Sequence, residues 1–381
     1  MSYRLLHIAD LHLDRAFAGM GCQGELARRR RQGLRDALRL AGELALEHHC
    51  DALTIAGDLY EHERAGVDTA RFLSERFASW RPMPVFIAPG NHDALLPGSV
   101  YRRTEWPDNV VVFEEPVLRP RRLEDGLTLW GLAHCEPAWQ GDPLAAGPEG
   151  AGVHLALFHG AELGSRPEGK SVHGPFLAEQ VRERGFAAAL AGHYHRRRLD
   201  EATGLLYPGS PEPLSFDDTG SRGPVVVEVK SNGSVRFEPV AANRWNAATI
   251  TCDVTGCTSL ERVIETVCAA VSDQAADHDR ERLLVRVDVQ GALDSSVALD
   301  LPTLESVARE RLDCALLKVR DLTTAEADLE LLLQERGTRG AFARAALAAI
   351  ERAEDPAETE LLGDALRYGL AALAGVEVGL R

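Results

Sequence analysis

Short apolar runs alternate with amphipathic stretches over about the first 240 residues. After residue 30, Leu34, Leu38, Ala41 and Ala45 recur at helical spacing, with charged side chains at the positions opposite them. Alternation of strands with one-sided helices is typical of layered α/β domains. The pattern predicts strands at residues 4–9, 51–56, 85–88, 127–132, 153–158, 187–191 and 225–229, and a Gly-, Pro- and Ala-rich loop at 141–152.

The alternation restarts after about residue 245. Strands are expected at residues 249–254, 283–289 and 315–319, with helices at 260–271 and 304–312. From residue 326 onward the chain is Ala- and Leu-rich and reads as helix, interrupted at Pro356. We therefore divide the chain into an α/β domain over residues 1–242, a smaller α+β domain over 245–322 and a helical segment over 325–381.

Five of the predicted strands in the first region are each followed by a short polar cluster. In open α/β sheets, ligands gather at the carboxyl ends of the strands, so all five clusters point to one place. The clusters contain Asp10 and His12, then Asp58, then Asn91, His92 and Asp93, then His159, and finally His193 and His195.

Two Asp, one Asn and four His in these clusters supply seven oxygen and nitrogen ligands, a set that suits Mn, Fe or Zn ions. Two such ions about 3.5–4 Å apart clamp a phosphate and generate a hydroxide near neutral pH, and one carboxylate must then bridge them. The competing interpretation is that these are ordinary core or surface residues, but then five polar clusters would have to follow five strands by coincidence. For histidines outside the clusters, among them His134 and His173, we favour the ordinary interpretation.

The composition and net charge of the chain bear on whether a nucleic acid could be the source of that phosphate. The chain has 42 Lys and Arg against 58 Asp and Glu, a net charge of −16, which argues against a basic DNA-binding surface. The imbalance is local, however: residues 1–250 hold 28 basic and 33 acidic residues, and residues 251–381 hold 14 and 25. Bound cations and local Arg clusters could therefore attract phosphate in the first region.

The cysteines and the N-terminus bear on the compartment. Seven Cys without a CxxC pair predict reduced thiols rather than disulfides or a zinc site. The absence of an apolar leader or an 18-residue apolar run predicts a cytoplasmic protein without membrane contact.

The motifs DLHLD, GDLYE, GNHD, FHG and GHYH together resemble those of the calcineurin-like metallophosphoesterase superfamily. The sequence YPGSP, followed by LSF, resembles the SbcD-type DNA-repair exonuclease branch and within it the YhaO-like bacterial proteins. The resemblance covers about residues 1–240 and implies a layered αββα domain, followed by a capping domain and C-terminal helices.

The resemblance also implies roles for individual residues. One metal ion, expected to be Mn²⁺, would be held by Asp10, His12, Asp58 and His195. A second would be held by Asp58, Asn91, His159 and His193, so that Asp58 bridges the two. His92 would stabilise the transition state or protonate the leaving oxygen. Asp93 would orient His92 or a ligand.

One position departs from the family pattern. Many family nucleases carry a His three residues after the bridging Asp, where this chain has Glu61, with His62 next. Exonuclease activity and its polarity are therefore left open. The Arg run at 28–31 fits either a solvated helix start or a phosphate contact. Substrate contacts are expected from Arg28, Arg31, Glu61, His62, Arg196 and Ser210.

By resemblance, the protein would be the DNA-cleaving subunit of a double-strand break repair complex with an SMC-like ATPase of the SbcC type, and would form a homodimer. The C-terminal helices would dock the ATPase, or else pack on their own capping domain. Two other functions remain open: a phosphoesterase for small nucleotides or diesters, and a non-catalytic subunit that binds DNA and caps the ATPase.

Overall fold

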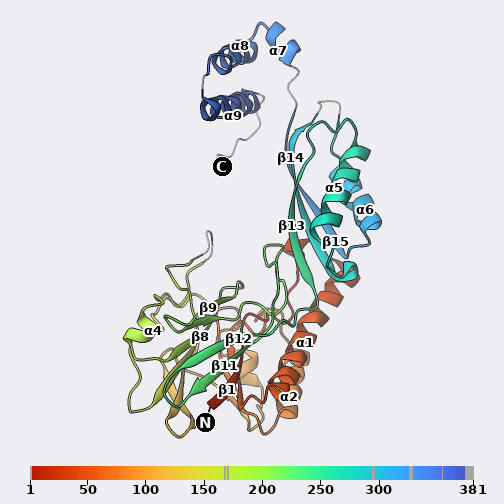
Figure 1. Ribbon diagram of the computed structural model, residues 1–381. Helices are drawn as coiled ribbons and strands as arrows, with labels where there is room; N and C mark the ends of the chain where they lie inside the picture. Colours follow the sequence, from red (N-terminus) through yellow and green to blue (C-terminus); the bar gives the residue numbers. More distant parts are fainter. Residues whose placement is uncertain are drawn as a thin grey trace. The chain divides into compact units, whose positions relative to one another are not determined.

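Two six-stranded sheets form the centre of the first of two units in the computed structural model, which describes residues 2–166, 169, 171–293, 297–325, 329–353 and 355–373. The first unit comprises Met1–Ala248 with Arg282–Leu284, and the second comprises Thr249–Glu281 with Val285–Arg381 (Figure 1).

The first sheet is built around parallel strands β1 to β4. Two antiparallel strands extend it beyond β1. Its order is β12 (Val235–Pro239), β11 (Val225–Lys230), β1 (Ser2–Ile8), β2 (Ala52–Ala56), β3 (Val85–Ala88) and β4 (Val110–Val112).

The second sheet also has a parallel centre, with antiparallel pairs at both edges. Its order is β5 (Arg119–Glu124), β6 (Leu127–Gly131), β7 (Val153–His159), β8 (Ala188–Gly192), β10 (Leu205–Tyr207) and β9 (Arg198–Asp200).

An apolar core lies between the two sheets, where Leu5 and Val227 of the first pack in one cluster with Leu157 and Leu190 of the second. The strands β2 and β8 are buried throughout, which agrees with their continuous apolar sequences. Helix α1 (Gly24–Glu47) covers β1 and β2 and buries its predicted apolar face, beside α2 (Val67–Ser79). On the other side, α4 (Gln180–Glu183) packs on β8 through a second apolar cluster. These layers confirm the predicted αββα fold.

The second unit contains a three-stranded sheet and two helices that pack on each other. Its sheet is ordered β13 (Asn246–Asp253), β14 (Leu283–Leu293) and β15 (Leu316–Ala325), and its helices are α5 (Leu260–Gln274) and α6 (Leu301–Leu312). The predicted apolar face of α5 is buried. The β-α-β-α-β order matches the pattern expected after residue 245.

After β15, the described part of the chain forms helices α7 (Leu329–Gln334), α8 (Thr338–Ile350) and α9 (Pro356–Leu373). Pro356 opens α9, because a proline fits the first turn of a helix where no backbone donor is needed. These helices share an apolar cluster of their own that includes Leu332, Ala343, Leu366 and Leu370. Residues 326–328, 354 and 374–381 of the expected helical segment lie outside the described residues. Among the described helices, none has the length and apolar character needed to cross a membrane.

Candidate metal centre

The five polar clusters follow β1, β2, β3, β7 and β8, which run parallel within their respective sheets. Contacts between the sheets join their ends. The backbone N–H of His193 donates to both carboxylate oxygens of Asp10 at 3.1 Å, and His159 Nδ1 lies 2.9 Å from the carbonyl oxygen of Ala56. The carboxyl ends of both sheets therefore meet at one place, as the sequence predicts.

Several of these residues hold backbone conformations that side chains other than glycine rarely adopt. The φ angle is 54° at Asp10, 50° at His12, 52° at Asp58 and 117° at His193. A left-handed conformation costs roughly 1–2 kcal/mol per residue, and such strain clusters at functional sites. At the end of β8 only glycine fits, because a Cβ on Gly192 would lie 1.9 Å from the carbonyl oxygen of Ala56. The turns thus bring the ligand-bearing loops into close contact.

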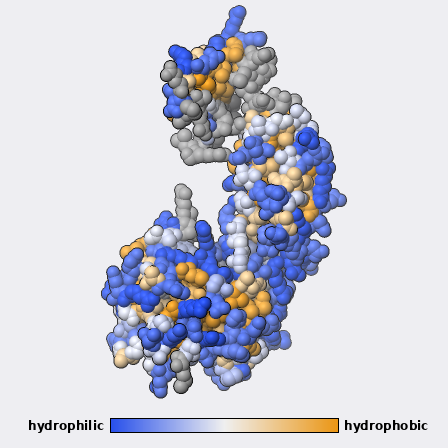
Figure 2. Space-filling model, in the orientation of Figure 1, coloured by the Kyte–Doolittle hydropathy of each residue, from blue (hydrophilic) through white to orange (hydrophobic). Residues whose placement is uncertain are grey.

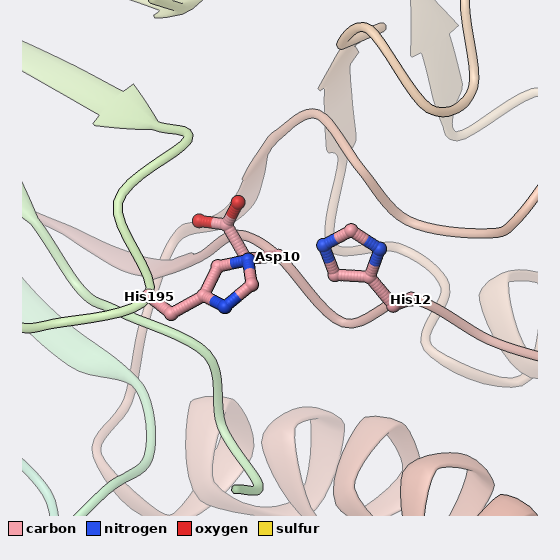
Figure 3. Close-up of side chains that lie close together, drawn as sticks. All are labelled: Asp10, His12 and His195. Atoms are coloured by element: carbon pink, nitrogen blue, oxygen red, sulfur yellow. The ribbon is translucent and has the colours of Figure 1, made fainter. Parts of the chain in front are cut away.

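One group of ligand atoms comes from Asp10, His12 and His195, all within 4.8 Å of one another (Figure 3). His12 Nδ1 donates to Glu61 Oε1 at 2.9 Å, so His12 Nε2 is the ring nitrogen with a free lone pair. That Nε2 atom is buried, has no hydrogen-bond partner among the described residues, and lies 3.5 Å from Asp58 Oδ2. A buried lone pair beside two carboxylates is the environment of a cation ligand.

A second group comes from Asp58, Asn91, His159 and His193. His159 donates from Nδ1 to Ala56, and His193 donates from Nε2 to the carbonyl oxygen of Ser171 at 3.1 Å. Their other nitrogens, His159 Nε2 and His193 Nδ1, lie 3.3 Å apart. Asn91 Oδ1 and Asp58 Oδ2 lie 3.0 Å and 3.4 Å from His159 Nε2.

This second arrangement fits a bound cation. Carbonyl oxygens only accept hydrogen bonds, so the ring protons of both histidines point away from the group. Burial lowers the pKa of His159 well below its usual value, which keeps the ring neutral. Four electron-rich atoms then face one another, and a divalent ion would relieve their repulsion. Asp10, Asp58 and His159 also have ligand atoms within 4.8 Å of one another, so the two groups adjoin.

Glu61, for which the sequence predicts a substrate contact, joins two histidines instead. Its Oε1 accepts from His12 Nδ1 and its Oε2 accepts from His92 Nδ1, each at 2.9 Å, and Arg15 Nη1 lies 3.3 Å from Oε1. Burial would raise the pKa of Glu61, but the hydrogen bonds from the two imidazoles hold it well below its usual value. Glu61 is therefore an anionic support for a candidate metal ligand and for His92.

His92 lies at the open side of the site. Its backbone N–H donates to Asp58 Oδ1 at 2.9 Å, and its ring packs edge-on against that of His12 with centroids 4.7 Å apart. The side chain is 42% exposed, whereas those of His12 and His159 are fully buried. The hydrogen bond to Glu61 raises the pKa of His92 to about 9, against the opposing effect of burial.

Asp93 acts on the loops rather than on the side chain of His92. Its carboxylate accepts from the backbone N–H groups of Asp58, Leu59 and Gly90 at 2.6–3.0 Å, and from the Tyr101 hydroxyl at 2.6 Å. This buried carboxylate thus ties the loop after β2 to the loop after β3. It holds the backbone at Asp58 and just before Asn91, and its expected role in orienting a ligand stays a prediction.

The other expected substrate contacts differ in accessibility. Arg28 and Arg196 are exposed, and Arg31 and His62 are half-buried. The expectation for Ser210 does not fit the structure: the residue is fully buried, and its hydroxyl accepts from Arg222 Nη1 at 2.8 Å. Ser210 therefore belongs to the support of the site.

Four residues that the sequence did not single out also lie at the site. His134 donates from Nε2 to the carbonyl oxygen of His159 at 2.7 Å, and His173 packs edge-on against His193. The sequence favours ordinary core or surface positions for both. Asp218 and Arg222 lie next to His195. No motif marks any of the four, although Asp218 closely follows the LSF stretch and could have been suspected from it.

Comparison with known proteins agrees with this geometry. The sequence profile of the family described as calcineurin-like phosphoesterase matches residues 3–197, just over half of the chain. The uncharacterized metallophosphoesterase YhaO of Bacillus subtilis (strain 168) is 27% identical over 275 residues, which cover 69% of this chain and 66% of YhaO. The DNA double-strand break repair protein Mre11 of Methanopyrus kandleri is 26% identical over 287 residues, 66% of this chain and 60% of that protein.

The matched region thus spans less than two thirds of each relative. A solved structure, that of TT1561 from Thermus thermophilus, is 13% identical and covers 63% of this chain and 99% of its own, with a TM-score of 0.36. The profile match, together with a site rich in metal-ligand side chains, places this chain in the calcineurin-like phosphoesterase family.

Proposed function

We propose that the first unit hydrolyses phosphodiester bonds in DNA with two bound divalent metal ions. The donor set suits Mn, Fe or Zn, and the family resemblance favours Mn²⁺ among them. The observation that carries the proposal is the convergence of candidate ligand atoms near the buried Asp58: two groups that share Asp10, with Asn91 and His193 next to His159. The similarity to a protein named for double-strand break repair supports DNA as the substrate.

Asp10, His12, Asp58 and His195 would hold one ion, and Asp58, Asn91, His159 and His193 the other. When bound, such a pair supplies a hydroxide nucleophile and neutralises charge on the reacting phosphate. The chain's own contribution is to keep these ligands in place, through Glu61 behind His12 and through Asp93 behind the loops of Asp58 and Asn91.

His92 would donate a proton to the oxygen that leaves the phosphorus. Its backbone is fixed on Asp58, its Nδ1 is held by Glu61, and its ring is accessible to a substrate. The remaining ring nitrogen, Nε2, would then meet the leaving oxygen. None of the charged neighbours of His92 named above is an acid positioned to replace it. Loss of His92 should therefore slow the reaction while both metal ions stay bound.

A basic pocket in the first unit would hold backbone phosphates away from the reacting one. It has a volume of about 410 Å³ and is lined by Arg28, Arg29, Arg244 and Arg282 together with Glu25 and Asp36. Four guanidinium groups in a chain of net charge −16 form a local concentration of positive charge. Arginine matches phosphate through paired N–H donors. The position of Arg28 in this pocket supports the substrate-binding role expected for it.

The helices α7 to α9 would dock an SMC-like ATPase of the SbcC type. They already share an internal apolar cluster, yet Leu333 and Leu361 are 40% and 70% exposed. Apolar residues gather on the visible face of this segment (Figure 2). Exposed leucines beyond a formed core are a common feature of helix-docking surfaces. Changing Leu361 to Glu should weaken co-purification with the ATPase while DNA cleavage by the isolated chain persists.

The deciding experiment compares four substrates side by side with Mn²⁺: single-stranded DNA, double-stranded DNA ends, a cyclic nucleotide and a small phosphodiester. We expect cleavage of DNA that is lost on chelation and absent in Asp58→Asn. Turnover of the small diester or the cyclic nucleotide without DNA cleavage would instead favour a small-substrate phosphoesterase. DNA binding without turnover of any substrate would favour a non-catalytic capping subunit.

A further inference from the structure

We infer that Asp218 and Arg222 are positioning residues that fix His195 at the metal centre, through a buried ion pair that contacts both the ring and the backbone of His195. This inference rests on the proposed metal centre and names the part of the chain that orients one of its ligands. Both side chains are almost fully buried, with 9% of Asp218 and 6% of Arg222 exposed. Solvent therefore screens their charges little, and the charges act on the groups around them.

Asp218 acts on the His195 ring. Asp218 Oδ2 lies 3.7 Å from His195 Nδ1, an ion-pair distance rather than a direct hydrogen bond. The same oxygen accepts from the backbone N–H groups of Leu214 and Ser215 at 2.9 Å and 3.0 Å, so the carboxylate is itself held in place. A fixed negative charge beside Nδ1 favours the ring form with its proton there, which leaves Nε2 to bind metal.

Arg222 acts on the His195 backbone. Its Nη1 donates to the carbonyl oxygen of His195 at 2.8 Å and to the carbonyl and hydroxyl oxygens of Ser210 at 3.1 Å and 2.8 Å. Its Nε donates to the carbonyl oxygen of Asp218 at 2.8 Å, and Nη2 lies 3.3 Å from Asp218 Oδ1. The backbone N–H of Ser210 also donates to the carbonyl oxygen of His195. One planar guanidinium thus joins the ligand loop after β8 to the segment that carries Asp218.

The same arrangement recurs around the other candidate ligands. His12 has the carboxylate of Glu61 on the ring nitrogen that faces away from the site, and His159 and His193 have backbone carbonyl oxygens there. Metal-bound histidines usually have such a partner, and its loss typically weakens metal affinity 10- to 100-fold. For His195 the group in this place is Asp218, and its support by Arg222 explains why a buried arginine is needed so close to a cation site.

The test measures Mn²⁺ binding to the full chain by isothermal titration calorimetry, together with the electron paramagnetic resonance spectrum of the loaded protein. The wild-type protein should bind two ions and show a coupled pair. Asp218→Asn should weaken one site about 10- to 100-fold, leave the other site unchanged and reduce the coupled signal. The matched control is Asp288→Asn in the second unit, where a buried Asp pairs with Arg320, and it should bind both ions like the wild type.

A second variant covers the case in which Asp218→Asn does not fold, as judged by circular dichroism. Arg222→Lys keeps the positive charge but loses the fork of donors to His195, Ser210 and Asp218, so it should weaken the same single site. Two ions bound with wild-type affinities by the folded variants would overturn the inference and leave the metal centre standing. A wild-type protein that binds no Mn²⁺ would overturn the proposed function, and the inference with it.

Discussion

His159 Nε2 and His193 Nδ1 lie 3.3 Å apart, although the outer nitrogen of each ring donates its proton to a backbone carbonyl oxygen. The two ring nitrogens that do not donate to these carbonyl oxygens therefore face each other inside a buried site. Nearby, Asp58 Oδ2 and Asn91 Oδ1 add two more oxygen atoms with available electron density. A bound cation would turn the repulsion among these four atoms into attraction.

The first prediction follows from that relationship: Mn²⁺ should stabilise the folded protein. At a free metal concentration 100 times the dissociation constant, one site adds about 2.7 kcal/mol to the free energy of unfolding. The melting temperature should rise with Mn²⁺ in a thermal scan and return to its starting value on chelation. His159→Gln should remove most of the rise. An equal rise in that variant would show that the ions bind elsewhere.

Variants of Asp58 and His92 should distinguish residues that bind metal from a residue that acts only in the chemical step. Asp58→Asn should abolish turnover and reduce the Mn²⁺ content, because the central carboxylate faces both ligand groups. His92→Ala should lower kcat by about 10²- to 10⁴-fold, the usual contribution of a positioned acid. Its metal content, measured by inductively coupled plasma mass spectrometry, should stay at the wild-type value. Loss of metal from His92→Ala would mean that His92 is a ligand.

Glu61 should matter for both histidines that it contacts. Glu61→Gln keeps the shape of the side chain but removes its charge, and an amide has only one oxygen to accept from His12 or His92. We expect 10- to 100-fold weaker Mn²⁺ binding together with a lower kcat. The exposed neighbour Glu63 offers a matched control, and Glu63→Gln should behave like the wild type. A change in KM alone would instead return Glu61 to a substrate-binding role.

The sequence predicted the buried strands and the ligand loops because both follow from local patterns. Continuous apolar runs mark β2 and β8, and each ligand cluster follows such a run directly. Short or exposed strands escaped prediction: β5 has the sequence RPRRLE with most side chains exposed, and β9 and β10 have three residues each. Their pairing depends on neighbours far away in the chain, which no local period encodes.

A supporting role was expected for Asp93, which lies within a motif, but those of Asp218 and Glu61 escaped prediction for the same reason. Asp218 lies 23 positions after His195 in the sequence, and Glu61 lies 49 positions after His12. Burial decides their role: Ser210 looked like a substrate contact within its motif, but the fold covers it and turns it toward Arg222. Ligand identity is thus readable from residue type and order, whereas the partner of each ligand depends on the packing of both sheets.

The burial of His7 predicts how the free energy of unfolding of the metal-free protein depends on pH. It is fully buried in β1, with Nδ1 3.0 Å from Thr54 Oγ1, and burial lowers its pKa to about 4 from an ordinary value of 6.5. Between those two values the unfolded chain binds more protons than the native state, so stability falls as the pH falls through this window. The contribution of His7 between pH 7 and pH 5 is about 2 kcal/mol.

His7→Gln should therefore lose less stability than the wild type over that range. Urea unfolding at pH 7 and pH 5 in the presence of a chelator measures the difference. The exposed His49 provides the control, since His49→Gln should keep the full pH dependence. Other buried histidines, such as His134 with its pKa lowered to about 4 by burial, leave a residual dependence in every variant. An unchanged loss in His7→Gln would contradict the assignment.

The basic pocket on α1 predicts how DNA binding responds to salt. Arg28 and Arg29 line the pocket, and the side chain of Arg28 is 71% exposed and free to move from Glu25 to a phosphate. Removing one phosphate-binding arginine should reduce the slope of log K against log salt by about 0.9 for duplex DNA. The double variant Arg28→Gln with Arg29→Gln should therefore bind duplex DNA more weakly and with a smaller slope, measured by fluorescence anisotropy in the presence of Ca²⁺. Hydrolysis of a small phosphodiester should stay at the wild-type rate, because none of the candidate metal ligands lines the pocket.

Arg262→Gln with Arg311→Gln removes two ion-paired arginines from the acidic second unit and serves as the control, with an unchanged slope. If both double variants lowered the slope equally, attraction would come from the overall charge of the chain and not from this pocket.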